Sequence, residues 1–319
     1  MTKNSFSYAL GIDVGGTNTD LGLVRSDGRI VSRENLPTSA YTELTPYVRD
    51  IMTKIESMTA QGDPEGGWTG HCPDDLTGIG IGAPNGNFYN GCVEWAPNLT
   101  MKGVLEFEKE FHKYVHIPVV LSNDANAAAY GEYIYGGAKG MDHFIMITLG
   151  TGVGSGIVVD GKLVHGSTGT AGELGHNILI PDGRPCSCGR KGCLEAYTSA
   201  RGIVQTYKEL GGTLPNADSK AIGDAANAGD PVALETFRQV GRWLGIACAN
   251  AVTFSAPQSI FLMGGPTKVG APLLEPLQAA FKEHLLNIYQ GKCDIRMSQL
   301  HANEVAILGA AALVEMRKN

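Results

Sequence analysis

One histidine and three cysteines gather in a short part of this sequence, and their spacing suits a metal ion. His176 stands ten positions before Cys186, and Cys186, Cys188 and Cys193 fall within eight residues with glycines between them. Zinc takes thiolate and imidazole ligands, and three cysteines with one histidine form one of its common closed sites. A local disulfide or an accidental cluster of thiols is the alternative. We predict a structural Zn²⁺ ion on these four residues.

Two glycine-rich turns of similar construction lie 135 residues apart. The first is Gly15-Gly16-Thr17-Asn18 and the second is Gly150-Thr151-Gly152, and each joins a strand to a returning strand that ends in Asp-Gly. Backbone N–H groups and a threonine hydroxyl at such bends bind phosphate oxygens. A single glycine hairpin is weak evidence, because most of them only connect strands. The pair favours one polyphosphate held from two sides.

Neither turn matches a Walker loop or a Rossmann fingerprint. The fold class is therefore predicted from the repeated strand–turn–strand unit. We expect an α/β protein with a two-lobed actin-like ATPase (ribonuclease H-like) fold, duplicated α/β domains and a central cleft. The small lobe would be residues 1–122, completed by a C-terminal helix at 303–319. The large lobe would be residues 123–302, carrying a helical block and the segment 186–193 with the three cysteines, called the zinc loop below.

The helices and strands that position these turns are predicted from hydrophobic periodicity and from the glycine and proline residues that mark turns. We expect helices at 41–59, 104–114, 125–135, 200–210, 220–228, 231–254 and 303–317, strands at 78–83, 119–122 and 259–263, and a surface excursion at 61–75. The strand at 259–263 runs into Gly264-Gly265, where backbone can lie against a planar base. An ordinary strand-to-helix connection is the alternative for that turn.

Asp124 stands where a strand ends and a helix begins, in Ser122-Asn123-Asp124-Ala125. Aspartate is among the best helix N-caps, which gives a purely structural explanation. The functional explanation is that its carboxylate orients an attacking hydroxyl and accepts the proton during phosphoryl transfer. Both roles are compatible.

The composition limits the partners. The chain has 319 residues, 43% hydrophobic and 18% charged, with a formal net charge of −7. No basic field is available for nucleic acid or an anionic membrane. Nothing after Met1 resembles an export signal, and no apolar run of about 18 residues is present to span a bilayer. We expect a cytoplasmic protein with no nucleic-acid or membrane partner.

Taken together, five motifs resemble the ROK family of sugar kinases and repressors over nearly the whole chain. They are Asp13-Val14-Gly15-Gly16-Thr17, Asn123-Asp124-Ala125-Asn126-Ala127, Leu149-Gly150-Thr151-Gly152-Val153-Gly154, Glu173-x-Gly175-His176 and Cys186-x-Cys188-Gly189-x2-Gly192-Cys193-x-Glu195. The resemblance implies an ATP-dependent hexose kinase that phosphorylates glucose at its 6-hydroxyl, with Asp124 as general base. It also implies self-association as a homodimer or homotetramer.

The resemblance also implies the binding residues. Those implied for the nucleotide, with Asp13 near Mg²⁺, are Asp13, Gly15, Gly16, Thr17, Asn18, Thr151, Gly152, Gly264 and Gly265. Those implied for the sugar are Asn98, Asn123, Asp124, Glu173, His176 and Glu195. If one nitrogen of His176 binds zinc, the other keeps its proton and donates to a sugar hydroxyl.

Several alternatives stay open. Other acceptors are N-acetylmannosamine, fructose and allose, and we expect positions 85–89 to decide among them. Many members of the family read Pro-Gly-Pro where this chain has Ala83-Pro84-Asn85-Gly86-Asn87, at the expected pocket rim. A repressor of this family carries a helix-turn-helix region, whereas the first strand here starts near Tyr8. A sugar sensor without catalysis would have no use for Asp124 beside two phosphate turns.

Overall fold

The structure, a computed structural model, describes residues 6–68, 72–301 and 303–317. It is an α/β protein that divides into two compact units. Unit 1 comprises Met1–Gly140, Lys162–Ala171 and Gln299–Asn319, and unit 2 comprises Met141–Gly161 and Gly172–Ser298. The chain therefore passes between the units four times.

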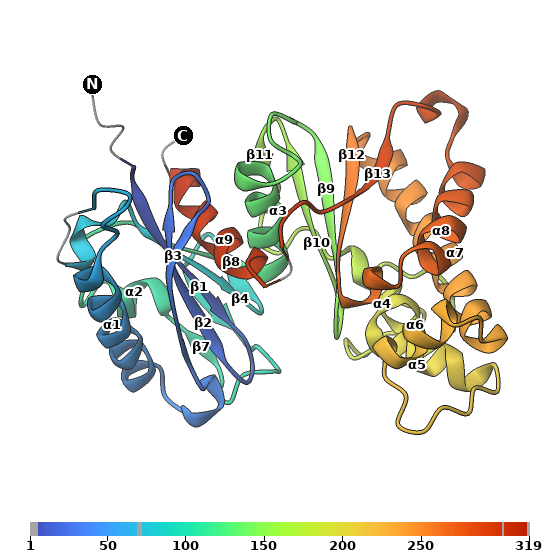
Figure 1. The fold of residues 1–319 in the computed structure, drawn as a ribbon, viewed down its shortest axis with the longest axis horizontal. Coiled ribbons are helices and arrows are strands. Elements are labelled where there is room, and N and C mark those ends of the chain that lie inside the picture. The colour runs from blue at the N-terminus through green and yellow to red at the C-terminus, as the bar shows by residue number, and fades with distance from the viewer. Residues whose placement is uncertain (1–5, 69–71, 302, 318–319) are drawn as a thin grey trace. The chain divides into compact units, whose positions relative to one another are not determined.

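Unit 1 is built on a five-stranded sheet with the order β3-β2-β1-β4-β8 (Figure 1). Its strands are β1 (Tyr8–Val14), β2 (Thr19–Arg25), β3 (Ile30–Leu36), β4 (Ile79–Ala83) and β8 (Val119–Asn123). The first three are antiparallel, while β4 and β8 add in parallel to β1. Because β1, β4 and β8 run the same way, their carboxyl ends meet at one edge of the sheet.

Alternation along β1 assigns a different set of helices to each face of this sheet. Leu10 and Ile12 point into the core shared with α1 (Leu44–Gln61) and α2 (Phe107–Phe111). Ala9 points to the other face, against α9 (Val305–Ala312), which packs on α3 (Asp124–Tyr135). A Cβ on Gly11 would lie 2.1 Å from the carbonyl oxygen of Ile307, so glycine allows α9 to press against the sheet.

Unit 1 also holds a small sheet of β5 (Gly86–Asn87), β6 (Cys92–Glu94) and β7 (Val104–Leu105). The neighbouring segment 162–171 is fastened to it by side chains. Tyr89 donates to the carbonyl oxygen of Gly166 at 2.7 Å, and the Phe88 ring stacks on His165 at 4.2 Å. The departure at 85–89 thus belongs to a packed hairpin.

Unit 2 repeats the plan of the first sheet with the order β11-β10-β9-β12-β13. The strands that unit 2 supplies are β9 (Phe144–Leu149), β10 (Val153–Val159), β12 (Ser259–Gly264) and β13 (Asp294–Met297), and the edge strand β11 (Lys162–Leu163) comes from the segment 162–171. As in unit 1, the first pair is antiparallel and two further strands add in parallel. The duplicated architecture predicted from the two glycine turns is present.

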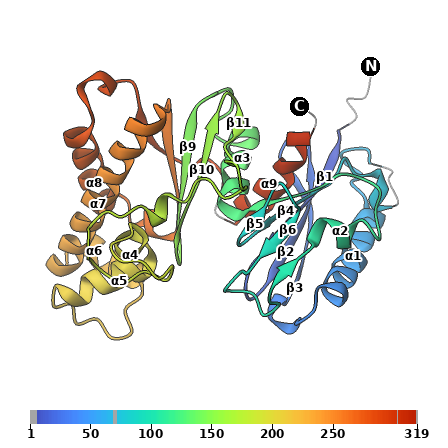
Figure 2. The ribbon, with the colours of Figure 1, turned by 180° about the vertical axis from the view of Figure 1, so that it is seen from behind.

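The helices of unit 2 pack against one face of this second sheet (Figure 1). They are α4 (Glu195–Thr198), α5 (Ala200–Glu209), α6 (Ser219–Asn227), α7 (Pro231–Ser255) and α8 (Ala271–His284). Asp218 and Asp230 cap α6 and α7 by accepting backbone N–H bonds of 2.7 Å, and Pro231 occupies the first turn of α7. Helices α7 and α8 lie side by side because Gly241 and Gly245 leave room for the α8 backbone (Figure 2).

Most expected elements are found within one to three residues of their bounds, with a few departures. Helix α8, with Pro276 inside it, was not expected. The expected helix 104–114 is wrong at its start, where β7 (Val104–Leu105) forms, and only α2 (Phe107–Phe111) is helical. The expected helix 303–317 is α9 (Val305–Ala312) followed by a 3-10 helix (Leu313–Arg317). The surface excursion includes 69–71, which lie outside the described residues, as do 302, 318 and 319 of the two expected lobes.

The expected lobe boundary after Ser122 differs from the division in the structure. The structure groups residues 123–140 with unit 1, because α3 packs against α9. The helix that begins with Asp124 therefore belongs to the first unit. Among the helices of the described residues, none combines the length and the apolar character needed to cross a membrane.

Candidate active site and metal centre

Asp13, predicted to bind the nucleotide near Mg²⁺, and Asp124, predicted as the general base, lie near each other at the carboxyl edge of the first sheet. Asp13 is the penultimate residue of β1, and Asp124 follows the last residue of β8. Gly82 of β4 lies between them: a Cβ there would be 4.0 Å from Asp13 Oδ1 and 3.8 Å from the Asp124 Cα. The glycine keeps this edge open between the two acids.

Asp13 titrates far above the usual range of aspartate. Its side chain is partly buried, and desolvation, followed by the negative charge of Asp124 and then of Asp20, raises the pKa of Asp13 to about 7. A cation beside this carboxylate would offset both causes. The position therefore suits a group that works next to a metal-bound phosphate.

Asn123, and not Asp124, caps helix α3. The backbone N–H of Ala125 donates to Oδ1 of Asn123 and to Oδ1 of Asp124, both at 2.8 Å. The Asp124 carboxyl still reaches solvent, although the surrounding protein raises its pKa and these backbone N–H groups oppose that rise. Since Asn123 supplies the cap, capping alone does not explain the second acid.

The first glycine turn has the compact geometry expected of a phosphate-binding bend. The N–H of Gly15 donates to the carbonyl oxygen of Asn18 at 3.0 Å, and Thr17 and Asn18 are exposed. A Cβ on Gly16 would lie 2.5 Å from the carbonyl oxygen of Asn98, so the segment 96–98 packs directly against the turn. Unit 1 thus brings together the predicted residues Asp13, Gly15, Gly16, Thr17, Asn18, Asn98, Asn123 and Asp124.

The second glycine turn packs against the side chain of Glu195, which is 9% exposed. Oε2 of Glu195 accepts the backbone N–H of Val153 at 3.0 Å, and a Cβ on Gly152 would lie 2.5 Å from the same oxygen. Oε1 accepts the Ser187 hydroxyl at 3.0 Å and lies 3.8 Å from Cys186 Sγ. One carboxylate therefore joins the predicted phosphate turn to the predicted zinc loop.

The predicted adenosine turn adjoins the second glycine turn. Gly264 has a φ of 119° and pairs with Leu149, whose carbonyl oxygen lies 1.8 Å from where a Cβ would stand. A hollow of about 250 Å³ opens beside Gly265, between the turn 265–269 and helix α6. Its lining residues are Ser219, Lys220, Gly223, Asp224, Asn227, Gly265, Pro266, Lys268 and Val269.

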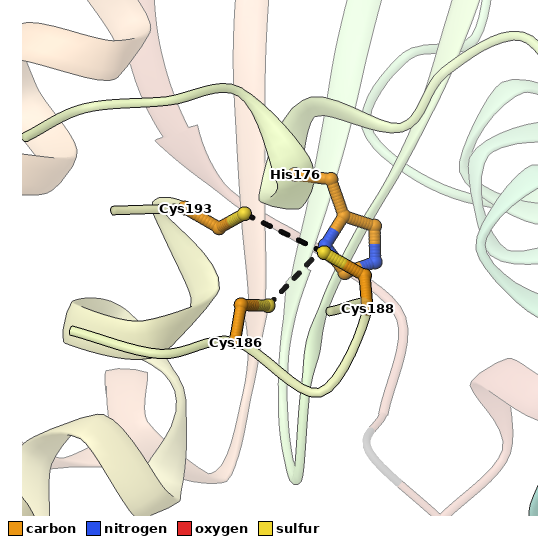
Figure 3. Close-up of side chains that lie close together, drawn as sticks. All are labelled: His176, Cys186, Cys188 and Cys193. Atoms are coloured by element: carbon orange, nitrogen blue, oxygen red, sulfur yellow. Dashed lines mark hydrogen bonds between the residues drawn. The ribbon is translucent and has the colours of Figure 1, made fainter. Parts of the chain in front are cut away.

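The four predicted metal ligands converge, each offering one ligand atom, with all of these atoms within 4.8 Å of one another. Figure 3 shows the side chains of His176, Cys186, Cys188 and Cys193 pointing toward a common centre. The Cys188 and Cys193 sulfurs are 3.7 Å apart, and Cys186 Sγ is 3.6 Å from Nδ1 of His176. Tetrahedral bonds of about 2.3 Å to sulfur and about 2.0 Å to nitrogen require edges of about 3.5–3.8 Å, so the residues fit Zn²⁺.

The backbone of the zinc loop is fixed by glycines and by short bonds. The N–H of Cys186 donates to the carbonyl oxygen of Arg190 at 2.8 Å, and Gly189 and Gly192 adopt φ values of 86° and 79°. The backbone N–H of Arg190 lowers the pKa of the Cys188 thiol to about 7, which favours the thiolate that a metal binds.

Arg184 anchors this loop, and sequence reasoning did not identify it. Its guanidinium lies 4.6 Å from the Tyr197 ring centre and 5.6 Å from that of Trp243, donates to Thr206, and pairs with Glu209. An arginine among exposed polar residues carries no sequence signal of such a position. Arg184 thereby ties the start of the loop to α5 and α7.

The sugar residues predicted in unit 2 lie at the edge of the metal centre. His176 directs Nδ1 to the cysteines, and its Nε2 is 4.0 Å from Oε2 of Glu173. Unit 2 thus brings together the predicted residues Thr151, Gly152, Glu173, His176, Cys186, Cys188, Cys193, Glu195, Gly264 and Gly265. The predicted site residues fall into two clusters, one on each unit.

Curated relatives include enzymes and regulators. The chain is 35% identical to a glucokinase of Streptomyces coelicolor, over 95% of this chain and 96% of that protein. It is 30% identical to an N-acetylmannosamine kinase of Escherichia coli, over 97% and 99%. It is 27% identical to a xylose repressor of Bacillus subtilis, over 96% of this chain but 77% of the repressor.

Solved structures agree with these relatives. A ROK glucokinase of Streptomyces griseus, in complex with glucose and AMPPNP, is 32% identical and matches 97% of this chain and all of that chain, with a TM-score of 0.75. A ROK hexokinase of Thermus thermophilus is 30% identical and matches 98% of this chain and all of that one, with a TM-score of 0.79. A ROK transcriptional regulator is 25% identical and matches 99% of this chain and 79% of its own, with a TM-score of 0.85.

The structural matches confirm the predicted actin-like ATPase fold. The sequence profile of the ROK family matches residues 9–317. With this match and relatives at 30–35% identity over nearly their whole length, the chain belongs to the ROK family.

Proposed function

We propose that this protein transfers the γ-phosphoryl group of ATP to a hexose, and that glucose, phosphorylated at its 6-hydroxyl, is the acceptor. The observation that carries the proposal is the Asp13–Gly82–Asp124 edge of unit 1, where an accessible carboxylate stands beside a phosphate-type turn. Glucokinases at 35% identity support the choice of glucose.

Asp124 is the general base of this proposal. Its carboxylate accepts a hydrogen bond from the attacking hydroxyl and takes the proton as the bond to phosphorus forms. With Asn123 as the helix cap, the side chain of Asp124 is available to substrate. Orientation contributes more than basicity, because an alcohol is a far weaker acid than aspartic acid.

We assign the phosphate oxygens to backbone N–H groups of the turns 15–18 and 150–152, and the adenosine to Gly264 and Gly265 at the hollow beside α6. Asp13 would hold the water shell of Mg²⁺, and the bound ion would supply positive charge that neutralises charge developing on the phosphate oxygens.

On the sugar side, the zinc centre serves orientation. Zn²⁺, when bound by His176, Cys186, Cys188 and Cys193, supplies a structural cross-link and fixes the tautomer of His176. Nε2 of His176 then donates to a sugar hydroxyl beside Glu173. We assign sugar hydroxyls also to Asn98, Asn123 and Glu195, although both oxygens of Glu195 accept bonds from the protein.

A coupled assay for ADP release tests the proposal, with glucose, N-acetylmannosamine, fructose, mannose and allose supplied in turn. We expect kcat/KM for glucose to exceed that for the other sugars by at least ~10-fold. A preference for N-acetylmannosamine would reassign the acceptor within the same reaction. Sugar binding without ADP release would establish a sensor and refute the kinase proposal.

We further propose that the chain self-associates, as a homodimer or a homotetramer. A cytoplasmic location belongs to the same proposal. Light scattering behind size exclusion measures the mass in solution, and a value of a single 33.7 kDa chain would contradict self-association.

A further inference from the structure

Glu132, in the last turn of helix α3, is a buried carboxylate outside the proposed active site. It is 0% exposed, and Oε1 accepts two backbone N–H groups, from Gly137 at 2.7 Å and from Gln299 at 3.0 Å. An acid at the negative end of a helix is electrostatically unfavourable. Local helix preference therefore does not account for its presence, and the two backbone bonds do.

The two donors belong to two different connections between the units. The chain leaves unit 1 after Gly140 and returns to it at Gln299. A Cβ on Gly137 would lie 2.9 Å from Cδ of Gln299, so the two connecting segments pack directly against each other. One carboxylate oxygen thus fixes two of the four passages, although the segments are 162 residues apart (299 − 137).

Helix α3 gives Glu132 a rigid support. A Cβ on Gly131 would lie 2.7 Å from the Cα of Gly309, and one on Gly309 would lie 2.6 Å from the carbonyl oxygen of Ala127. The backbones of α3 and α9 are in close contact there, and such packing resists sliding. Asp124 stands at the first turn of the same helix and Glu132 at its last.

We propose that Glu132 is a positioning residue: it fixes the segments 136–140 and 299–301 to α3 and so holds in place the helix that begins with Asp124. Its loss frees both connections at once. The Asp124 carboxylate then adopts the reactive arrangement less often. The kinetic part of this proposal rests on the proposed kinase function, whereas the structural part does not.

Hydrogen–deuterium exchange of Glu132→Ala, Glu132→Gln and wild type tests the structural part. In Glu132→Ala we expect amide exchange at 136–140 and 299–301 to rise at least 10-fold, while the strands of unit 1 keep their protection. Glu132→Gln retains an acceptor oxygen and should restore most of that protection. If the alanine variant does not fold, Glu132→Asp, whose shorter side chain cannot reach both donors, replaces it.

Asp63→Asn is the matched control. Asp63 is also a buried carboxylate of unit 1, 3% exposed; it accepts the Tyr8 hydroxyl at 2.9 Å and pairs with Arg25, and these partners belong to β1 and β2 and not to either connection. We expect this variant to lower the Tm without raising exchange at 136–140 or 299–301.

Kinetics with glucose and ATP complete the test. Glu132→Ala should lower kcat at least 10-fold, Glu132→Gln much less, and Asp63→Asn less than 2-fold. Unchanged exchange at both connections in Glu132→Ala, or equal effects of the glutamine and alanine variants, would overturn the proposal. Raised exchange with a wild type that does not phosphorylate sugar would refute the proposed function and leave the role of Glu132 intact.

Discussion

At the scale of single residues, the chemistry depends on the unequal surroundings of Asp13 and Asp124. Asp13 is partly enclosed by the sheet and the first glycine turn, and Asp124 begins a helix whose cap is another residue. Two nearby carboxylates raise each other's pKa unless a cation lies between or beside them. The pair is thus prepared for a magnesium nucleotide.

Asp13→Asn should stabilise the free protein above neutral pH. Because the folded pKa of Asp13 is about 7, against an unfolded value of 3.8, the folded state binds more protons in that window. The free energy of unfolding of the wild type therefore falls as pH rises from about 4 to about 7. The variant does not lose stability in this way. Its free energy of unfolding should therefore exceed that of the wild type by an amount that grows between about pH 4 and about pH 7, to about 1–3 kcal/mol at pH 8.

Denaturant unfolding at pH 4.5, 6 and 8 without nucleotide measures this difference. Asp50→Asn, on α1, is the control: the Tyr41 hydroxyl lowers the pKa of Asp50, so this carboxylate stays ionised across the range and the variant should show no such growth. A variant of Asp13 with a constant stability difference at all three values would show that the raised pKa is wrong.

Asp124→Asn should separate binding from chemistry. The amide keeps the shape of the side chain but does not accept the hydroxyl proton, so we expect kcat to fall by about 10²-fold or more while the Kd for glucose stays within about 3-fold. Steady-state kinetics and calorimetric titration measure the two quantities. Near-normal turnover would eliminate Asp124 as the base.

At the scale of elements, the zinc loop and the second glycine turn form one connected structure. Glu195 accepts from Val153 on the turn and from Ser187 in the loop, while Arg184 fastens the loop to α5. If the segment 186–193 loses its fixed conformation, Glu195 loses its bond to Ser187, and the predicted phosphate-binding turn loses part of its support. In the proposed function, a metal ion on this loop would therefore support both substrates.

Cys188→Ser should lose the metal and weaken both substrates. Removing one of four ligands opens the tetrahedral site and frees the segment 186–193, so His176 loses its fixed orientation. We expect less than ~0.2 equivalents of zinc and KM for glucose raised at least 10-fold, with a smaller rise for ATP. Elemental analysis and kinetics measure these effects.

Cys72→Ser is the control for that variant, because Cys72 is exposed and lies in unit 1. It should keep one equivalent of zinc and wild-type kinetics. A zinc-free wild type with full activity would contradict the assigned role of the metal.

The sequence predicts those elements and residues whose signals are local. Glycine turns followed by Asp-Gly, and cysteines spaced for a metal, are legible because backbone conformation and ligand spacing constrain neighbouring residues. Helix α8 was missed because Pro272 and Pro276 suggest a loop. Pro272 lies in the first turn, where proline is tolerated, whereas Pro276 lies inside the helix, which packs along α7. Arg184 and Glu132 were missed because their partners are distant in sequence, and only folding brings them together.

At the scale of the whole molecule, two units with the same sheet plan each carry part of the predicted site. Unit 1 holds Asn98, Asn123 and Asp124, and unit 2 holds Glu173 and His176. We expected the lobe boundary after residue 122 because the sequence shows where strand β8 ends. The packing of α3 on α9, which groups α3 with unit 1, has no local sequence signal.

Glucose binding should protect both units. A ligand that binds only the folded state at 100 times its Kd stabilises that state by about 2.7 kcal/mol. If residues of both units contact the sugar, amide exchange should slow at 96–99 and 123–126 in unit 1 and at 173–177 in unit 2. Hydrogen–deuterium exchange with galactose as a control sugar measures this, and protection of one unit only would contradict a shared sugar site.

The central claim is phosphoryl transfer from ATP to the sugar, and the products test it most directly. Incubation of the protein with Mg²⁺, ATP and glucose, followed by phosphorus NMR, should yield ADP and glucose 6-phosphate in equal amounts, with Asp124→Asn at least ~10²-fold slower. ADP accompanied by inorganic phosphate, or intact ATP beside bound glucose, would contradict the account.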